Sequence, residues 1–210
     1  ALIERAGPAR PALFDTWLNL ALLAGTETEA CKALADRPAL SDSYAARIFC
    51  IARAGDWHTA ALLYETALGL DLLSTTQASL LAQFLDPETV EGSLALAPSS
   101  AITPLLFRLY EAVGQPLPTQ GLPRAYASAD LRPSSGLKAR LEAGERLAHT
   151  GALPPNRLLG LYTERSPAAS GGVWDRAALI QSFDQAMTRE NPGPISEILP
   201  DAWHMMRDQG

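Results

Sequence analysis

The sequence contains few β-branched aliphatic residues. Of its 210 residues, three are Val and seven are Ile, whereas 36 are Ala and 34 are Leu. Buried strands of a parallel sheet need runs of Val and Ile, and Ala and Leu favour helices. The composition therefore excludes an enzyme fold built on a parallel sheet and predicts an all-α protein.

Basic residues are also scarce, and they are scattered. Two Lys and 15 Arg stand against 23 Asp and Glu, which gives a formal net charge of −6. A protein that binds nucleic acid needs a basic patch to neutralise phosphates, and the sequence has no such cluster. No apolar run approaches the roughly 20 residues of a membrane-spanning helix. We therefore expect neither a nucleic-acid partner nor a membrane span.

Only two cysteines are present, Cys31 and Cys50, and each lies in a predicted helix. If these helices form an antiparallel hairpin that turns near Ala39, Cys50 lies about one helical turn beyond the position opposite Cys31. Because a disulfide needs Cα atoms within about 7 Å, the spacing permits either a bridge or two buried thiols. A bridge would indicate an oxidising compartment.

The chain begins with Ala1 rather than Met, and no signal peptide is visible. We expect either a chain whose leader has been removed or a piece of a longer protein. Together with the two cysteines and the scarcity of Lys, this start favours an exported or periplasmic location. A cytoplasmic location is the alternative.

Residues typical of helix starts and ends predict ten to twelve short helices joined by short connections. The predicted helices cover residues 12–24, 26–37, 41–54 and 56–70, begin again at 74 and 86, and then cover 102–113, 124–129, 134–149, 155–163, 173–189 and 195–206. Capping boxes are predicted at Thr26–Glu29 and Ser74–Gln77. The glycines that end helices are unevenly spaced, which indicates an irregular stack of helical hairpins rather than a regular repeat array.

Two lobes are expected, an N-terminal one at 1–97 and a C-terminal one at 98–210, packed as one continuous unit. The connection at 115–123 is rich in Pro and Gly and is a second place for a boundary.

One segment, residues 55–68, carries a recognisable pattern of aromatic and small residues. Its positions are Gly55, Asp56, Trp57, Ala60, Tyr64 and Ala67. This segment resembles the second half of a tetratricopeptide repeat, in which small residues let two helices approach closely. The preceding helix keeps only Tyr44 of the family pattern. The resemblance implies a right-handed stack of helical hairpins, a concave surface that binds a protein or peptide, and no catalysis.

No residue pattern points to catalysis, a cofactor or a metal ion. His58, His149 and His204 lie in separate segments, and none has the spacing of metal ligands on a helix. Glu142 and Glu145 are three residues apart, but arginines nearby give them a structural explanation. We therefore predict no catalytic residue, no bound cofactor and no metal site.

The connections at 115–123 and 166–172 are candidate edges of a binding groove. Tyr126, Tyr162 and Arg165 lie close to them and are predicted to offer polar contacts to a partner.

These observations favour a non-enzymatic scaffold that binds a protein or peptide. An alternative is the helical scaffold of a cell-wall enzyme that processes peptidoglycan, because such scaffolds are also irregular stacks of Ala- and Leu-rich hairpins. A third hypothesis is a small-molecule hydrolase, whose signature would be a deep pocket that unites a histidine with two carboxylates. Fold alone does not decide between these.

Overall fold

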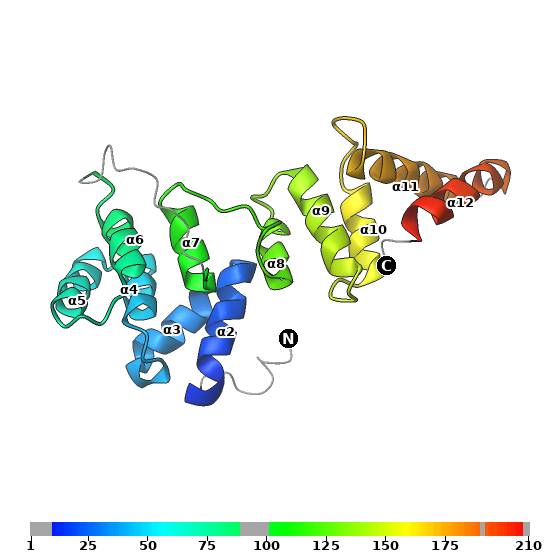
Figure 1. The fold of residues 1–210 in the computed structure, drawn as a ribbon. Helices are drawn as coiled ribbons and strands as arrows, with labels where there is room; N and C mark the ends of the chain where they lie inside the picture. The colour runs from blue at the N-terminus through cyan, green and yellow to red at the C-terminus, as the bar shows by residue number, and fades with distance from the viewer. Residues whose placement is uncertain (1–9, 89–100, 190–191, 208–210) are drawn as a thin grey trace. The chain divides into compact units, whose positions relative to one another are not determined.

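The computed structural model describes residues 10–88, 101–189 and 192–207. Within them, the chain forms eleven α-helices and two short 3-10 helices, and no β-strand (Figure 1). This confirms the all-α prediction. Contacts divide the chain into two compact units, Ala1–Pro118 and Thr119–Gly210.

The division between the units falls within the Pro- and Gly-rich connection at 115–123. The boundary predicted at residue 97 lies outside the described residues. So does most of the helix that was predicted to begin at Asp86 and Pro87.

The first unit contains six α-helices among its described residues. They are α2 (Pro11–Ala24), α3 (Thr28–Asp36), α4 (Tyr44–Arg53), α5 (Trp57–Gly69), α6 (Thr75–Leu85) and α7 (Pro104–Ala112), with a 3-10 turn, η1 (Pro38–Leu40), between α3 and α4. Each helix packs on the next, as a hairpin stack requires, and α7 also packs against α2 (Figure 1). In an open solenoid each repeat contacts only its neighbours. The first unit is therefore a closed helical bundle.

Apolar residues from both ends of the first unit explain this closure. Phe14 and Leu22 of α2 share one buried cluster with Leu109 and Tyr110 of α7. A fully buried aromatic or Leu side chain stabilises the fold by about 1.5–3 kcal/mol. Burying these large side chains against one another favours the return of α7 to α2.

Within the segment that resembles a tetratricopeptide repeat, Ala60 and Ala67 are fully buried on α5. This helix packs closely against α4. The small residues thus lie where two helices approach, as the pattern predicts.

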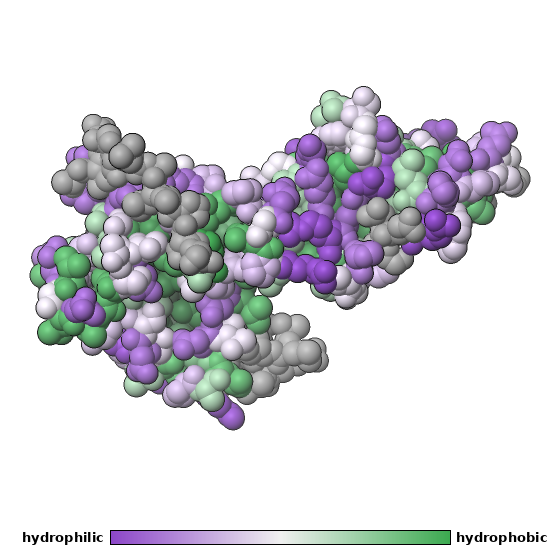
Figure 2. Space-filling model, viewed as in Figure 1, coloured by the Kyte–Doolittle hydropathy of each residue, from purple (hydrophilic) through white to green (hydrophobic). Residues whose placement is uncertain are grey.

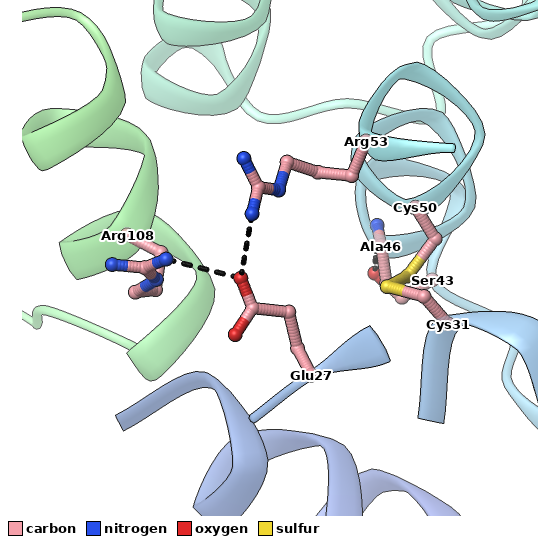
Figure 3. The surroundings of a disulfide bond; sticks show 7 residues. All are labelled: Glu27, Cys31, Ser43, Ala46, Cys50, Arg53 and Arg108. Carbon is pink, nitrogen blue, oxygen red and sulfur yellow. Dashed lines mark hydrogen bonds and ion pairs between the residues drawn. A yellow bond between two sulfur atoms is a disulfide. The ribbon is translucent and has the colours of Figure 1, made fainter. Parts of the chain in front are cut away.

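The cysteines form a disulfide between α3 and α4 (Figure 3). The Cα atoms of Cys31 and Cys50 are 4.9 Å apart. The hairpin turn is asymmetric, because η1 and an extended stretch around Ser41 intervene before α4 begins. This asymmetry places Cys50 opposite Cys31. The sequence permitted either a bridge or two buried thiols, and the structure contains the bridge.

The second unit begins with a short 3-10 turn and helix, followed by four longer helices. These are η3 (Arg124–Tyr126), α8 (Ala127–Asp130), α9 (Leu137–Ala148), α10 (Pro155–Thr163), α11 (Val173–Thr188) and α12 (Pro192–Met206). From α8 onward each helix packs on the next, and α11 also contacts α9. The core of the unit includes Leu141, Leu158 and Ala177 from α9, α10 and α11.

The capping box predicted before α6 is confirmed. The backbone N–H of Gln77 donates to the Ser74 hydroxyl at 3.3 Å, and the N–H of Ser74 donates to the Gln77 side chain at 3.0 Å. Two of the orphan donors at the helix start are satisfied by this exchange.

The capping box predicted at Thr26 and Glu29 is wrong. The helix begins at Thr28, and Glu27 precedes it without a side-chain cap. The backbone N–H of Thr26 instead donates to Ala21 and completes the turn that ends α2 at the left-handed Gly25. Thr26 therefore belongs to the end of one helix rather than to the start of the next.

The helices predicted to begin at Ser41 and Ser134 begin later. Ser43 caps α4 by accepting the N–H of Ala46 at 3.2 Å. Gly136 precedes α9, and no side chain caps that helix.

Two glycines in the second unit make a matched pair for a stability experiment. A Cβ atom on Gly144 of α9 would lie 2.7 Å from Cδ1 of Leu161 and 3.3 Å from Cδ1 of Leu158, whereas one on Gly160 of α10 would meet nothing within 4 Å. We expect Gly144→Val to lower the free energy of unfolding by about 1–3 kcal/mol through overpacking. Gly160→Ala is expected to raise it by about 0.5–1 kcal/mol, because Ala favours a helix. Urea unfolding followed by circular dichroism measures both, and a stabilised Gly144→Val variant would contradict the close approach of α9 and α10.

Candidate functional site

Two of the three predicted partner-binding residues are not at the surface. Tyr126 and Tyr162 are 5% and 1% exposed, which corrects the expectation that they offer polar contacts to a partner. The ring of Tyr162 belongs to the core cluster of the second unit, and burial raises the pKa of both tyrosine hydroxyls.

Arg165 lies at the surface, just after α10. Its Nε is 3.9 Å from Glu164, whose carboxylate accepts two hydrogen bonds of 2.6 Å from Arg140 of α9. These hydrogen bonds and the nearby positive charges hold the pKa of Glu164 below its ordinary value. Partner binding at Arg165 stays a prediction.

A buried polar network joins three helices of the second unit. The Tyr162 hydroxyl of α10 donates to Glu145 Oε1 of α9 at 2.5 Å, and Arg176 of α11 donates to both carboxylate oxygens at 2.6 Å. This pairing, opposed by desolvation, raises the pKa of Arg176. Glu145 is therefore a fixed carboxylate that is neutralised by a bidentate arginine.

A polar cavity of about 800 Å³ opens along one face of α9. It is lined by Gln120, Leu122, Arg124, Glu142, Glu145, Arg146 and His149. The last four follow the i, i+3, i+4, i+7 spacing that places side chains on one helix face. Hydrophilic residues run along α9 on the face seen in Figure 2.

The two arginines of this cavity, Arg124 and Arg146, form no direct ion pair with a carboxylate of the described residues. Arg146 donates from Nη1 to the Thr119 hydroxyl and from Nη2 to the Thr119 carbonyl, each at 3.1 Å. The Thr119 hydroxyl in turn donates to Asp130, which fixes the whole arrangement. Arg124 is exposed and forms no ion pair within the described residues.

An apolar cavity of about 580 Å³ adjoins the polar one. It lies among the turn between α9 and α10, the α10 helix and the last turn of α12, with Leu158, Leu159 and Trp203 in its lining. Trp203 is 70% exposed, the largest such fraction among the exposed large apolar side chains. His149 lines both cavities and marks where they meet.

The other histidines line neither cavity. His58 is exposed at the start of α5, in the first unit, and His204 lines a separate cavity of about 650 Å³ between α11 and α12. No group of three His, Cys, Asp or Glu side chains within the described ranges is arranged to hold a metal ion. The described helices include none with the length and apolar character of a membrane span.

The first unit offers an apolar surface. The exposed side chains Leu62, Leu68, Leu70 and Leu72 gather on α5 and just after it (Figure 2). Inside the same unit, Glu27 Oε1 lies 3.0 Å from Arg108 and 3.6 Å from Arg53, so α3, α4 and α7 are joined by ion pairs (Figure 3). These charges are structural ties rather than a ligand site.

No family model matches this chain, and no curated protein or solved structure is significantly similar to it. The fold defines an all-α protein whose helices pack mainly on their chain neighbours, which is compatible with a helical-repeat class.

Sequence reasoning missed the pair of cavities, although one signal was present. The spacing of Glu142, Glu145, Arg146 and His149 was enough to place all four on one helix face. The meeting of α9 with the last turn of α12 could not be found in this way, because it depends on packing between distant segments.

Proposed function

We propose that this chain is a non-enzymatic scaffold that binds a protein or peptide partner through its second unit. The observation that supports this most is the junction of a polar and an apolar cavity at His149. Binding sites are concave and largely apolar, with a few polar groups that fix orientation, and the combined site has this character. A Trp that is mostly exposed beside an apolar cavity is a typical anchor of a binding surface.

The ionisable groups of the site favour binding over catalysis. Both oxygens of Glu145 are held by Arg176 and Tyr162, and a general base needs a carboxylate that is free to take a proton. Glu142 lies 3.6 Å from Lys138 and is partly exposed. No carboxylate of the described residues forms a hydrogen bond or ion pair with His149, although Glu142 and Glu145 line the same cavity.

An exported or periplasmic location belongs to the same proposal. The Cys31–Cys50 bridge supports it, because disulfides persist in oxidising compartments and are rare in the cytosol.

Photo-crosslinking in an extract of the source organism tests the proposal. The photoreactive residue p-benzoylphenylalanine is introduced at His149 or Leu159, which line the cavities, and at Leu62 of the first unit as a control. We expect the same protein to be captured from positions 149 and 159 and not from 62, and its capture to be lost with Trp203→Ala. Equal capture from all three positions would contradict the site. Recovery of glycan fragments without a protein would instead favour the scaffold of a cell-wall enzyme.

A second candidate, a hydrolase, is favoured by one specific observation. The polar cavity brings His149 together with Glu142 and Glu145, the combination expected of such an enzyme. A panel of p-nitrophenyl esters and glycosides tests it. Turnover that is abolished by His149→Ala would establish the hydrolase and overturn the non-enzymatic proposal.

A further inference from the structure

The charges of the polar cavity select the kind of ligand that enters it. Its two carboxylates have cationic partners outside the cavity lining: Glu145 pairs with Arg176 at 2.6 Å and Glu142 with Lys138 at 3.6 Å. Arg146 binds Thr119, whose hydroxyl donates to Asp130, and Arg124 is exposed; neither arginine forms a direct ion pair within the described residues. The cavity therefore presents two guanidinium groups without a direct carboxylate partner among these residues, and it favours an anionic ligand.

The adjoining cavity selects an apolar group. Its lining includes Leu153, Leu158, Ile180 and Met206, with Trp203 at the surface. Removing an apolar side chain from water is favourable by about 25 cal/mol per Å² buried. An aliphatic or aromatic side chain is the group that gains most from this cavity.

His149 lines both cavities, so a ligand that fills both must carry its anionic group next to its apolar group. We propose that the occupant is an extended peptide segment of a partner protein in which apolar side chains stand next to acidic side chains. This inference rests on the proposed function and adds the chemistry of the partner. Because Arg124 begins the 3-10 turn η3 and Arg146 lies on helix α9, side-chain carboxylates along a segment fit the two arginines better than one terminal carboxylate does.

Fluorescence anisotropy with short peptides tests this inference on the full chain. The probe has about eight residues, which span about 26 Å when extended. It carries two leucines next to two glutamates, flanked by serines, and both termini are blocked; both orders of the two pairs are measured. The matched control replaces the glutamates with glutamines.

We expect the glutamate peptide to bind at least about tenfold more tightly than the glutamine peptide, since charge-assisted contacts are about twice as strong as neutral ones. Raising the salt from about 50 mM to about 500 mM is expected to reduce this difference through screening. Arg124→Ala is expected to weaken binding of the glutamate peptide about fivefold. Arg189→Ala removes an exposed arginine of the same unit that lines neither cavity, and we expect it to leave the affinity for both peptides unchanged.

The Trp203→Ala variant distinguishes a failure of the proposed acidic preference from a failure of peptide binding itself. It is expected to weaken both peptides about tenfold, because Trp203 contributes apolar contact rather than charge. Equal affinity for the two peptides, with both sensitive to Trp203→Ala, would overturn the acidic preference and leave peptide binding in place. Binding only of peptides with a free terminal carboxylate would also overturn it. Failure of all peptides to bind would overturn the inference, and loss of crosslinking from positions 149 and 159 would reject the function itself.

Discussion

Replacing Glu145 with Ala is expected to lower the free energy of unfolding of the second unit by about 3 kcal/mol, because it leaves a largely buried arginine and hydroxyl unpaired. The Glu145 side chain is 9% exposed and that of Arg176 is 21% exposed. Neither Arg176 nor Tyr162 regains water fully when the carboxylate is removed. Hydrogen exchange of peptides from α9, α10 and α11 measures the loss.

The same helix supplies a control for this variant. Glu142→Ala removes a carboxylate whose side chain is 36% exposed and whose partner, Lys138, lies 3.6 Å away. We expect a change within about 0.5 kcal/mol, as for other exposed ion pairs. A loss from Glu145→Ala no larger than that from Glu142→Ala would show that the network of Tyr162, Glu145 and Arg176 does not hold the helices together.

Replacing both cysteines with Ala is expected to cost the first unit about 3 kcal/mol, since a bridge across a loop of this size restricts the unfolded chain. The bridge joins residues 19 apart in the sequence and ties α3 to α4. Urea unfolding with and without dithiothreitol gives the comparison. Dithiothreitol should destabilise the natural chain and have no effect on the double variant.

A thiol titration tests whether Cys31 and Cys50 are bridged, which the expected loss of stability assumes. The denatured, unreduced chain is expected to give no reaction with Ellman's reagent, and the reduced chain is expected to show two thiols. Two reactive thiols without reduction would contradict the disulfide, and with it the argument for an oxidising compartment.

Local features of this chain could be predicted from its sequence. The start of α6 depends on Ser74 and Gln77 alone, which exchange hydrogen bonds over one turn. The Gly25 turn follows from the freedom of glycine at positive φ, where its φ is 73°. Such features need no knowledge of distant contacts, and the order of the described helices could be predicted for the same reason.

Features set by distant contacts could not be predicted. Thr26 resembles a helix cap, but the end of the preceding helix uses its backbone. Tyr126 and Tyr162 have side chains that suit either a surface or a core, and only tertiary packing buries them. The return of α7 to α2 likewise joins segments about 90 positions apart, whose buried residues share one cluster.

The central claim is that the second unit binds a partner where its two cavities meet at His149. The most direct measurement is a titration of the isotopically labelled chain with the leucine–glutamate peptide, followed by the shifts of backbone amide resonances. We predict shifts in residues 120–124, 142–149 and 203–207, with the resonances of α5 unchanged. Shifts confined to α5, where Leu62 and Leu68 lie exposed, or no shifts at any peptide concentration, would contradict the claim.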